Sequence, residues 1–163
     1  MKKLLLIFIG LLFLNLRGEA RMAETKTILC FGNSLTAGYG VAQDDSWPML
    51  IQEKINSRGY DYEVIQSGLS GETSAGGLSR INWVMKKPVD VFILELGPND
   101  GLRGLPLEHT QSNLQKIIDI VKEKNPNVKI LLAGMRVPPN MGPEYSEKFI
   151  RVFEELAKKN SSE

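Results

Sequence analysis

Four short apolar runs alternate along the chain with longer stretches in which apolar residues recur every three or four positions. The runs cover residues 27–31, 63–66, 89–96 and 128–133. Because they are nearly continuous in apolar residues, they are typical of strands buried on both faces, as in a parallel sheet. The pattern therefore predicts four parallel strands, each followed by a helix.

The stretches after these runs have the spacing of amphipathic helices. The first follows Ser46, which we expect to cap its N-terminus. We expect the second to begin near Thr73 and the fourth to span 144–159. Helix by helix, the apolar faces consist of Trp47, Leu50, Ile51 and Ile55; Leu78, Ile81 and Met85; Leu114, Ile117, Ile118 and Val121; and Tyr145, Phe149, Val152, Phe153 and Leu156.

The alternation of strands and helices predicts an α/β fold, in which a parallel sheet carries helices on both faces through right-handed crossovers. The 163 residues suffice for one such domain. The loops that follow the strands then lie at the carboxyl ends of the sheet and form one crevice. Those loops are 32–40, 67–73, 97–104 and 134–142.

Three of these loops carry residues suited to acyl chemistry. Taken singly, Ser34 fits a helix cap, Gly71 a tight turn and Asn99 an ordinary turn residue. Taken together, the backbone amides of Ser34 and Gly71 and the side-chain amide of Asn99 would form an oxyanion hole. Such a site stabilises the charge that develops on a carbonyl oxygen under attack.

Other chemistries fit the sequence less well. A glycine-rich loop can cradle phosphate, but no Gly-Lys-Ser/Thr follows here, and residues 32–40 lack the dinucleotide-binding spacing. The sequence shows no metal-ligand pattern, so we expect neither a metal nor an organic cofactor. Lys and Arg number 20 against 19 Asp and Glu, without a basic block interleaved with aromatics, which argues against nucleic-acid binding.

The segments 32–38, 70–74 and 97–101 together resemble the sequence blocks of the SGNH (GDSL-type) hydrolases. The resemblance is strongest to the branch of bacterial arylesterases, acyl-CoA thioesterases and lysophospholipases, and it extends over residues 27–143. It implies a flavodoxin-like three-layer α/β/α sandwich. It also implies that Ser34 is the nucleophile and that Gly71 and Asn99 are oxyanion donors.

The resemblance further implies which residues bind substrate. Leu102 and Arg103 lie in a segment similar to the substrate loop of this branch, and Pro138 lies in one similar to its fourth strand-end loop. Asn33, beside the nucleophile, stands where the family usually has aspartate. Because both side chains can hydrogen-bond the backbone of a turn, we expect this change to have a mild effect on a substrate-binding position.

The family's general base is not evident in the sequence. Family members finish with Asp-x-x-His, whereas this sequence has no aspartate three residues before a histidine. Its one histidine, His109, is expected to be solvated in the first turn of a helix. We therefore expect a hydrolase domain over 25–163 that is truncated at its C-terminus, with four strands present and the fifth missing. Without a base, we expect only the residual turnover that an oxyanion hole and binding provide.

The N-terminus predicts export. Residues 1–22 combine lysines, an apolar run and small residues in the order of a secretory signal. We expect a periplasmic or secreted monomer with no stable membrane span after signal removal; a cytoplasmic protein that starts at Met22 is the alternative. Cys30 is the only cysteine and lies in an apolar run, which predicts a buried thiol without a disulfide.

The sequence thus favours a serine hydrolase that forms an acyl-enzyme on Ser34. The family resemblance implies small-molecule carboxyl esters, thioesters or lysophospholipids as its substrates. The alternative from another class is a non-catalytic module that binds an acyl chain or an acetylated glycan. A flavodoxin-like electron carrier fits the fold alone, and a fold does not fix a function.

Overall fold

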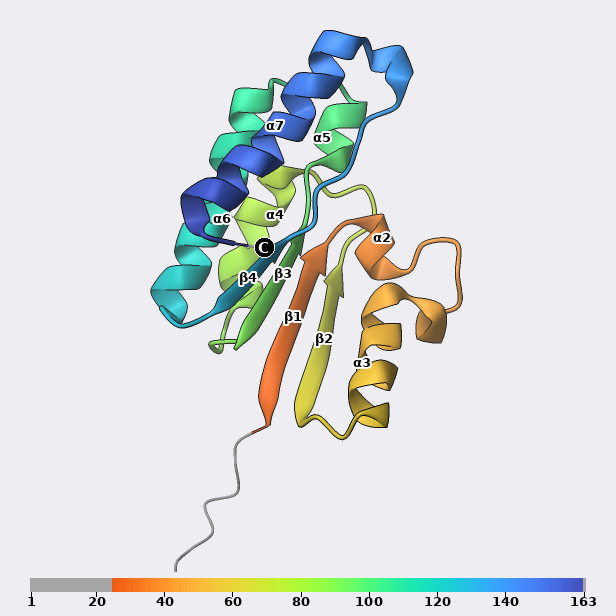
Figure 1. Cartoon of the computed structure of the whole chain (residues 1–163), viewed down its shortest axis with the longest axis vertical. Coiled ribbons are helices and arrows are strands. Elements are labelled where there is room, and N and C mark those ends of the chain that lie inside the picture. Colours follow the sequence, from red (N-terminus) through yellow and green to blue (C-terminus); the bar gives the residue numbers. More distant parts are fainter. Residues whose placement is uncertain (1–24, 163) are drawn as a thin grey trace, which may run out of the picture.

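A four-stranded sheet forms the middle layer of the protein, whose computed structural model describes residues 25–162 (Figure 1). The sheet order is β2-β1-β3-β4 and every pairing is parallel, as predicted. The predicted secretory signal over 1–22 lies outside the described residues. The strands are β1 (Lys26–Gly32), β2 (Tyr62–Gly68), β3 (Val91–Glu95) and β4 (Lys129–Leu132).

Strand β3 is shorter than the predicted run 89–96. Val89 and Leu96 are both buried, so they belong to the core, but they flank the hydrogen-bonded ladder. Next to Val89, the Asp90 carboxylate accepts a bond from the Thr27 backbone N–H (2.8 Å). An apolar run reports burial, and it does not mark where strand pairing begins or ends.

Helices cover both faces of the sheet, which confirms the predicted α/β architecture (Figure 1). Helix α3 lies on one face, while α4, α6 and α7 lie on the other. The helices are α2 (Ser34–Ala37), α3 (Trp47–Ser57), α4 (Ser74–Val84), α5 (Pro98–Leu102), α6 (Leu107–Lys124) and α7 (Pro143–Asn160), with short 3-10 turns η1 (Gln43–Asp45) and η2 (Pro139–Met141).

Successive residues of β1 point to opposite faces of the sheet, as strand geometry requires. Ile28 and Cys30 pack toward α3, whereas Leu29 and Phe31 join the larger core beneath α4, α6 and α7. Burial raises the pKa of the Cys30 thiol to about 12. Cys30 is fully buried, which confirms the predicted buried thiol.

Two predicted helix caps have different outcomes. Thr73 precedes α4 and its Oγ1 accepts a bond from the Gly76 N–H (3.3 Å), as expected. Ser46 also occupies the cap position of α3, but its hydroxyl donates to the Gln43 carbonyl (2.7 Å) and does not cap the helix. The prediction for Ser46 was wrong because its oxygen accepts from the Gln66 side-chain amide (3.1 Å) and not from an N–H of the helix.

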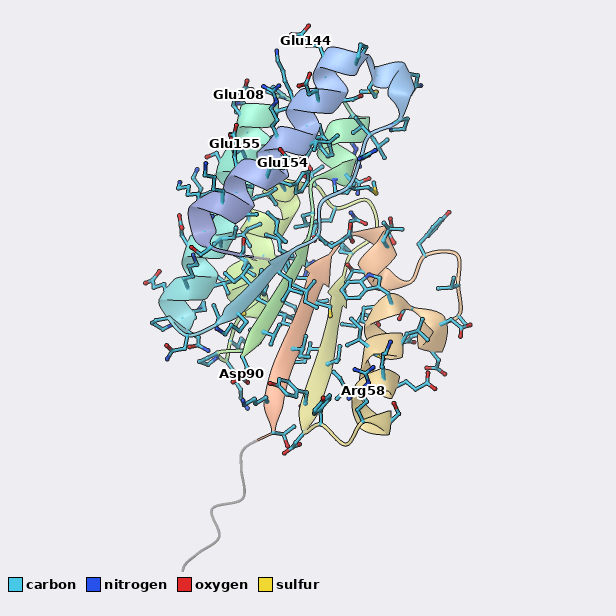
Figure 2. All side chains as sticks on the ribbon, viewed as in Figure 1. Arg58, Asp90, Glu108, Glu144, Glu154 and Glu155 are labelled. Atoms are coloured by element: carbon cyan, nitrogen blue, oxygen red, sulfur yellow. The ribbon has the colours of Figure 1, made fainter. Side chains whose placement is uncertain are left out.

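The outer surface of α6 and α7 carries the acidic side chains labelled Glu108, Glu144, Glu154 and Glu155 (Figure 2). On α7, Lys148 pairs with Glu144, which lowers the pKa of that carboxyl. These charges lie on a solvated face, whereas the opposite face of α7 is buried. Among residues 25–162, no helix combines the length and the apolar character needed to cross a membrane.

Candidate active site

The loops that follow β1, β2 and β3 are hydrogen-bonded to one another at the carboxyl ends of the strands. The Leu69 N–H donates to the Gly32 carbonyl (2.9 Å), which joins the first loop to the second. The Arg103 guanidinium donates to the Gly71 carbonyl (3.0 Å), which joins the third loop to the second. Residues far apart in the sequence are thereby held at one rim of the sheet.

Ser34 is the first residue of α2 and is half-buried. The Asn33 side chain caps this helix, because its Oδ1 accepts from the Leu35 N–H (3.0 Å) and lies 3.4 Å from the Ser34 hydroxyl. Within residues 25–162, the Ser34 N–H has no hydrogen-bond acceptor, as is usual for the first amide of a helix. The Ser34 N–H is therefore available at the rim, whereas its hydroxyl donates to Asn33 Oδ1.

Gly71 is exposed and has a φ of +78°, a backbone conformation that favours glycine. Its N–H also lacks an acceptor among the described residues. A Cβ added at this position would lie 3.9 Å from the Arg103 guanidinium and would meet nothing closer, so the space beside Gly71 is open. The loop thus presents a free backbone donor to solvent.

Asn99 lies in α5, and its side chain faces the Gly71 loop. Its Nδ2 donates one hydrogen to the backbone carbonyl of Glu72 (2.9 Å). A primary amide has two hydrogens on nitrogen, so the second remains free. The next residue, Asp100, is buried and accepts bonds from the Ser74 N–H (2.8 Å) and hydroxyl (2.6 Å), which ties α5 to the start of α4.

Arg80, on α4, holds the Gly71 loop in place. Its guanidinium forms two 2.5 Å bonds with the buried carboxylate of Glu72. It also donates to the backbone carbonyls of Gly32 (3.4 Å) and Ser67 (3.0 Å), at the ends of β1 and β2. With its Cζ 4.1 Å from the centre of the Phe31 ring, Arg80 links two strand ends to the loop. Nothing in its local sequence pattern distinguished it from a solvated helix residue.

The predicted substrate-binding residues occupy different environments. Leu102 and Arg103 are exposed, and Arg103 touches the Gly71 loop. Pro138 is exposed in the segment after β4, where its carbonyl accepts from the Met141 N–H (3.1 Å). Asn33 is 2% exposed, and its side chain is turned toward the protein interior.

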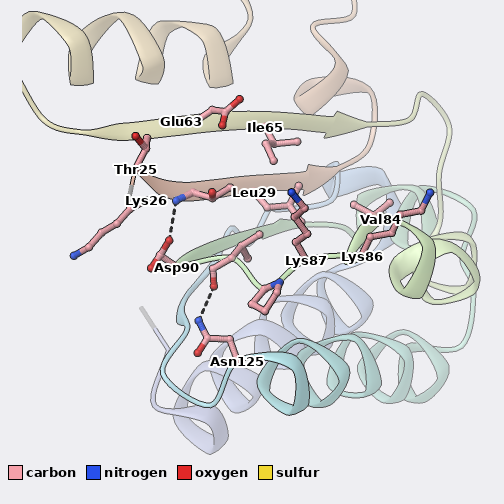
Figure 3. A pocket seen from close by; sticks show the side chains of 13 residues that line it. Thr25, Lys26, Leu29, Glu63, Ile65, Val84, Lys86, Lys87, Asp90 and Asn125 are labelled. Atoms are coloured by element: carbon pink, nitrogen blue, oxygen red, sulfur yellow. Dashed lines mark hydrogen bonds between the residues drawn. The ribbon is translucent and has the colours of Figure 1, made fainter. Parts of the chain in front are cut away.

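A separate cavity opens at the opposite, amino-terminal edge of the sheet (Figure 3). Lys87, Glu63 and Asp90 line it, together with apolar side chains. Asp90 is already bonded to the Thr27 N–H, and the Asn125 amide donates to the Val89 carbonyl (2.9 Å). None of Ser34, Gly71 and Asn99 lines this cavity, so we place the candidate site at the carboxyl edge.

Residues 30–162 match the profile of the GDSL-like Lipase/Acylhydrolase family. The chain belongs to this family. The match includes the three loops described above, so the predicted SGNH (GDSL-type) resemblance is confirmed.

The chain is also similar in sequence and structure to named members of the family. The chain is 39% identical over 139 residues to Esterase TesA of Pseudomonas aeruginosa, covering 84% of this chain and 68% of TesA. It is 37% identical to thioesterase 1/protease 1/lysophospholipase L1 of Escherichia coli K12, covering 85% and 64%. The crystal structure of AlinE4, an SGNH-hydrolase family esterase, superposes with a TM-score of 0.81 at 39% identity, covering 87% of this chain and 76% of AlinE4.

His109 lies in the first turn of α6 of this GDSL-like protein and is exposed. Between the described residues His109 and Ser34 there is no hydrogen bond; the Ser34 hydroxyl faces Asn33 instead. Within residues 25–162, no group of three or more His, Cys, Asp or Glu side chains is arranged to hold a metal ion.

Proposed function

We propose that the protein is a serine hydrolase of carboxyl esters or thioesters, with Ser34 as its nucleophile. The observation that carries the proposal is the presence, on three joined loops, of three N–H donors without an acceptor among residues 25–162. These are the backbone N–H groups of Ser34 and Gly71 and the second amide hydrogen of Asn99. Such donors can bind an oxyanion without first breaking internal bonds.

In the proposed reaction, the Ser34 Oγ attacks the carbonyl carbon of the substrate. The carbonyl oxygen becomes an oxyanion held by Ser34, Gly71 and Asn99. The bond to the leaving alcohol or thiol then breaks, the leaving group takes up the hydroxyl proton, and an ester on Ser34 remains. Attack by water releases the acid and restores the serine. Neither a metal nor an organic cofactor takes part in this scheme.

The substrate class follows from family membership and from the rim of the site. Relatives carry the names esterase, thioesterase and lysophospholipase, so we propose small-molecule esters, thioesters or lysophospholipids. The exposed Leu102, Arg103 and Pro138 would contact the substrate at this rim. For Asn33, whose side chain is buried, we propose an indirect contribution through the turn that carries Ser34.

A serine hydroxyl needs a base to accept its proton. Because His109 is exposed and makes no hydrogen bond to Ser34, we propose that the 163-residue polypeptide turns over esters slowly. Loss of the histidine base lowers turnover by about a millionfold in a serine hydrolase, which leaves the contribution of the oxyanion hole and binding.

We further propose that residues 1–22 direct export of a monomer to the periplasm or the exterior.

The same absence of a histidine contact favours a second candidate function. A site that retains the oxyanion donors but lacks a base can bind an acyl group without cleaving it. In that case the protein would be a non-catalytic acyl- or glycan-binding module on a hydrolase fold.

Labelling with a fluorophosphonate in the presence of added imidazole tests Ser34 as the nucleophile, and an assay of p-nitrophenyl acetate without imidazole separates the two candidates. The hydrolase predicts slow product release that Ser34→Ala abolishes, whereas the binding module predicts saturable binding of the ester without release that depends on Ser34. Imidazole supplies a soluble base, and the oxyanion donors stabilise the phosphonyl oxygen. A hydrolase site predicts that Ser34 is labelled much faster than the neighbouring exposed Ser70, and that Ser34→Ala removes the adduct. Equal labelling of Ser34 and Ser70 would contradict the hydrolase and leave the binding module.

A further inference from the structure

Glu95, at the end of β3, is a buried carboxyl that the proposed reaction does not use. It is 7% exposed and lies beneath the turn that carries Ser34. Three donors converge on it. The Asn33 side chain donates to Oε1 (2.7 Å), and the Asn33 N–H (3.3 Å) and Thr36 hydroxyl (2.8 Å) donate to Oε2.

These donors lie on both sides of the proposed nucleophile. Asn33 immediately precedes Ser34, and Thr36 follows it by two residues in α2. One carboxylate thus bonds both the N-cap residue and the third residue of this one-turn helix. The fit is tight, because a Cβ on Gly32 would lie 2.8 Å from Glu95 Oε2. Only glycine at position 32 leaves room for this arrangement.

The surroundings of Glu95 match its ionised form. Each of its hydrogen-bond partners is a donor, and neither Asn33 nor Thr36 is ionisable. Helix α2 has no acidic or basic residue, and the guanidinium of Arg80, which donates to the Gly32 carbonyl, makes no hydrogen bond to Glu95 among the described residues. Burial raises the pKa of the Glu95 carboxyl, while the bonds from Thr36 and Asn33 act in the opposite direction.

We propose that Glu95 is a positioning residue that holds Ser34 toward the oxyanion donors, and that Asn33 is the polar partner that makes an ionised Glu95 tolerable. This inference rests on the proposed role of Ser34 as nucleophile. Asn33 must present a donor to Glu95 and, through Oδ1, an acceptor to the Leu35 N–H. An aspartate at position 33 would instead face Glu95 with a second carboxylate, and such a pair retains a proton.

The donor and the acceptor of the Asn33–Glu95 hydrogen bond can be exchanged without removing the bond. In the double variant Asn33→Asp, Glu95→Gln, the new glutamine amide can donate to the new aspartate, whose other oxygen still accepts from Leu35. The single variant Glu95→Gln places two amides together and loses part of the bonding to Asn33 and Thr36. If Glu95 only filled space, the double variant and the single variant Glu95→Gln would behave alike.

The test compares wild type, Glu95→Gln, Asn33→Asp and the double variant, with Glu63→Gln as a control for an exposed glutamate on β2. Two quantities are measured: the rate of Ser34 phosphonylation with added imidazole, and hydrogen exchange of the backbone amides of α2. Misplacement of a reacting group costs between about tenfold and a hundredfold in rate. We expect Glu95→Gln to slow labelling by that factor and to speed exchange, and the double variant to recover most of both.

For Asn33→Asp, labelling relative to wild type is expected to fall as pH rises through the raised pKa of the carboxyl pair, a dependence that the double variant lacks. The proposal is overturned if a folded Glu95→Gln labels and exchanges like wild type, or if the double variant is as slow as the worse single variant. A different result would contradict the proposed function itself: wild-type Ser34 would not be labelled faster than Ser70.

Discussion

The side-chain amide of Asn99 donates to the backbone carbonyl of Glu72, with 2.9 Å between nitrogen and oxygen. This bond fixes the orientation of the amide, because it uses one hydrogen and directs the other away from the Glu72 carbonyl. The carbonyl itself is held in place, since the Glu72 carboxylate is paired with Arg80. The orientation of a proposed oxyanion donor therefore depends on a salt bridge outside the site.

Replacement of Asn99 by alanine removes one oxyanion donor. Loss of such a donor costs about a hundredfold to a thousandfold in rate, so Asn99→Ala should slow phosphonylation of Ser34 by that factor. The measurement is the labelling rate with added imidazole, with Asn82→Ala, an exposed residue of α4, as the matched control. Equal rates in the two variants would exclude Asn99 as a donor.

Replacement of Arg80 by methionine leaves the Glu72 carboxylate, whose side chain is 2% exposed, without its partner. Breaking a buried ion pair from one side costs about 3 kcal/mol or more. Urea unfolding should show a loss of that size for Arg80→Met. The control, Arg58→Met, removes an arginine that is exposed at the end of α3 (Figure 2) and should change stability little. A similar small effect in both variants would mean that Arg80 does not hold the loop.

Glu95 predicts a specific pH dependence of stability. Because burial raises the pKa of its carboxyl, the folded protein holds the proton more tightly than the unfolded chain does. Its contribution is fully present below the ordinary glutamate pKa and is lost as pH rises through the raised value. The free energy of unfolding of wild type, relative to Glu95→Gln, should therefore fall as pH rises above the ordinary glutamate pKa of about 4.3. A rise in this relative free energy over the same pH range would contradict a raised pKa for the Glu95 carboxyl.

Cys30 should be inert in the native protein. It is fully buried, and its thiol pKa is raised to about 12, so almost no thiolate forms near neutral pH. A thiol-reactive dye should report no reaction with the folded chain and one thiol per chain in denaturant, since the sequence has one cysteine. Rapid labelling of the folded protein would show that β1 opens readily.

The sequence predicts the layers well because their signals are local. The apolar runs locate all four strands of the described chain, and Thr73 marks the start of α4. The contacts that arrange the site are not local, since Asn33 and Glu95 are 62 residues apart in the sequence. A signal for Glu95 did exist: it is a lone acidic residue in the otherwise apolar end of the third run, where a charge requires a buried partner.

The partners of Arg80 could not be predicted in the same way. It lies among polar and apolar residues of an ordinary amphipathic helix, and its role emerges only when the ends of β1 and β2 are placed side by side. Ser46 shows the same limit at shorter range, because the turn that captures its hydroxyl is not marked in the apolar pattern. Strand pairing and turn geometry decide these contacts.

A crystal structure of the Ser34 phosphonate adduct shows directly whether Ser34, Gly71 and Asn99 form an oxyanion hole. One phosphonyl oxygen should lie within hydrogen-bonding distance of the Ser34 N–H, the Gly71 N–H and the Asn99 side-chain amide. An adduct whose phosphonyl oxygens contact none of these donors, or that forms on another serine, would contradict this arrangement.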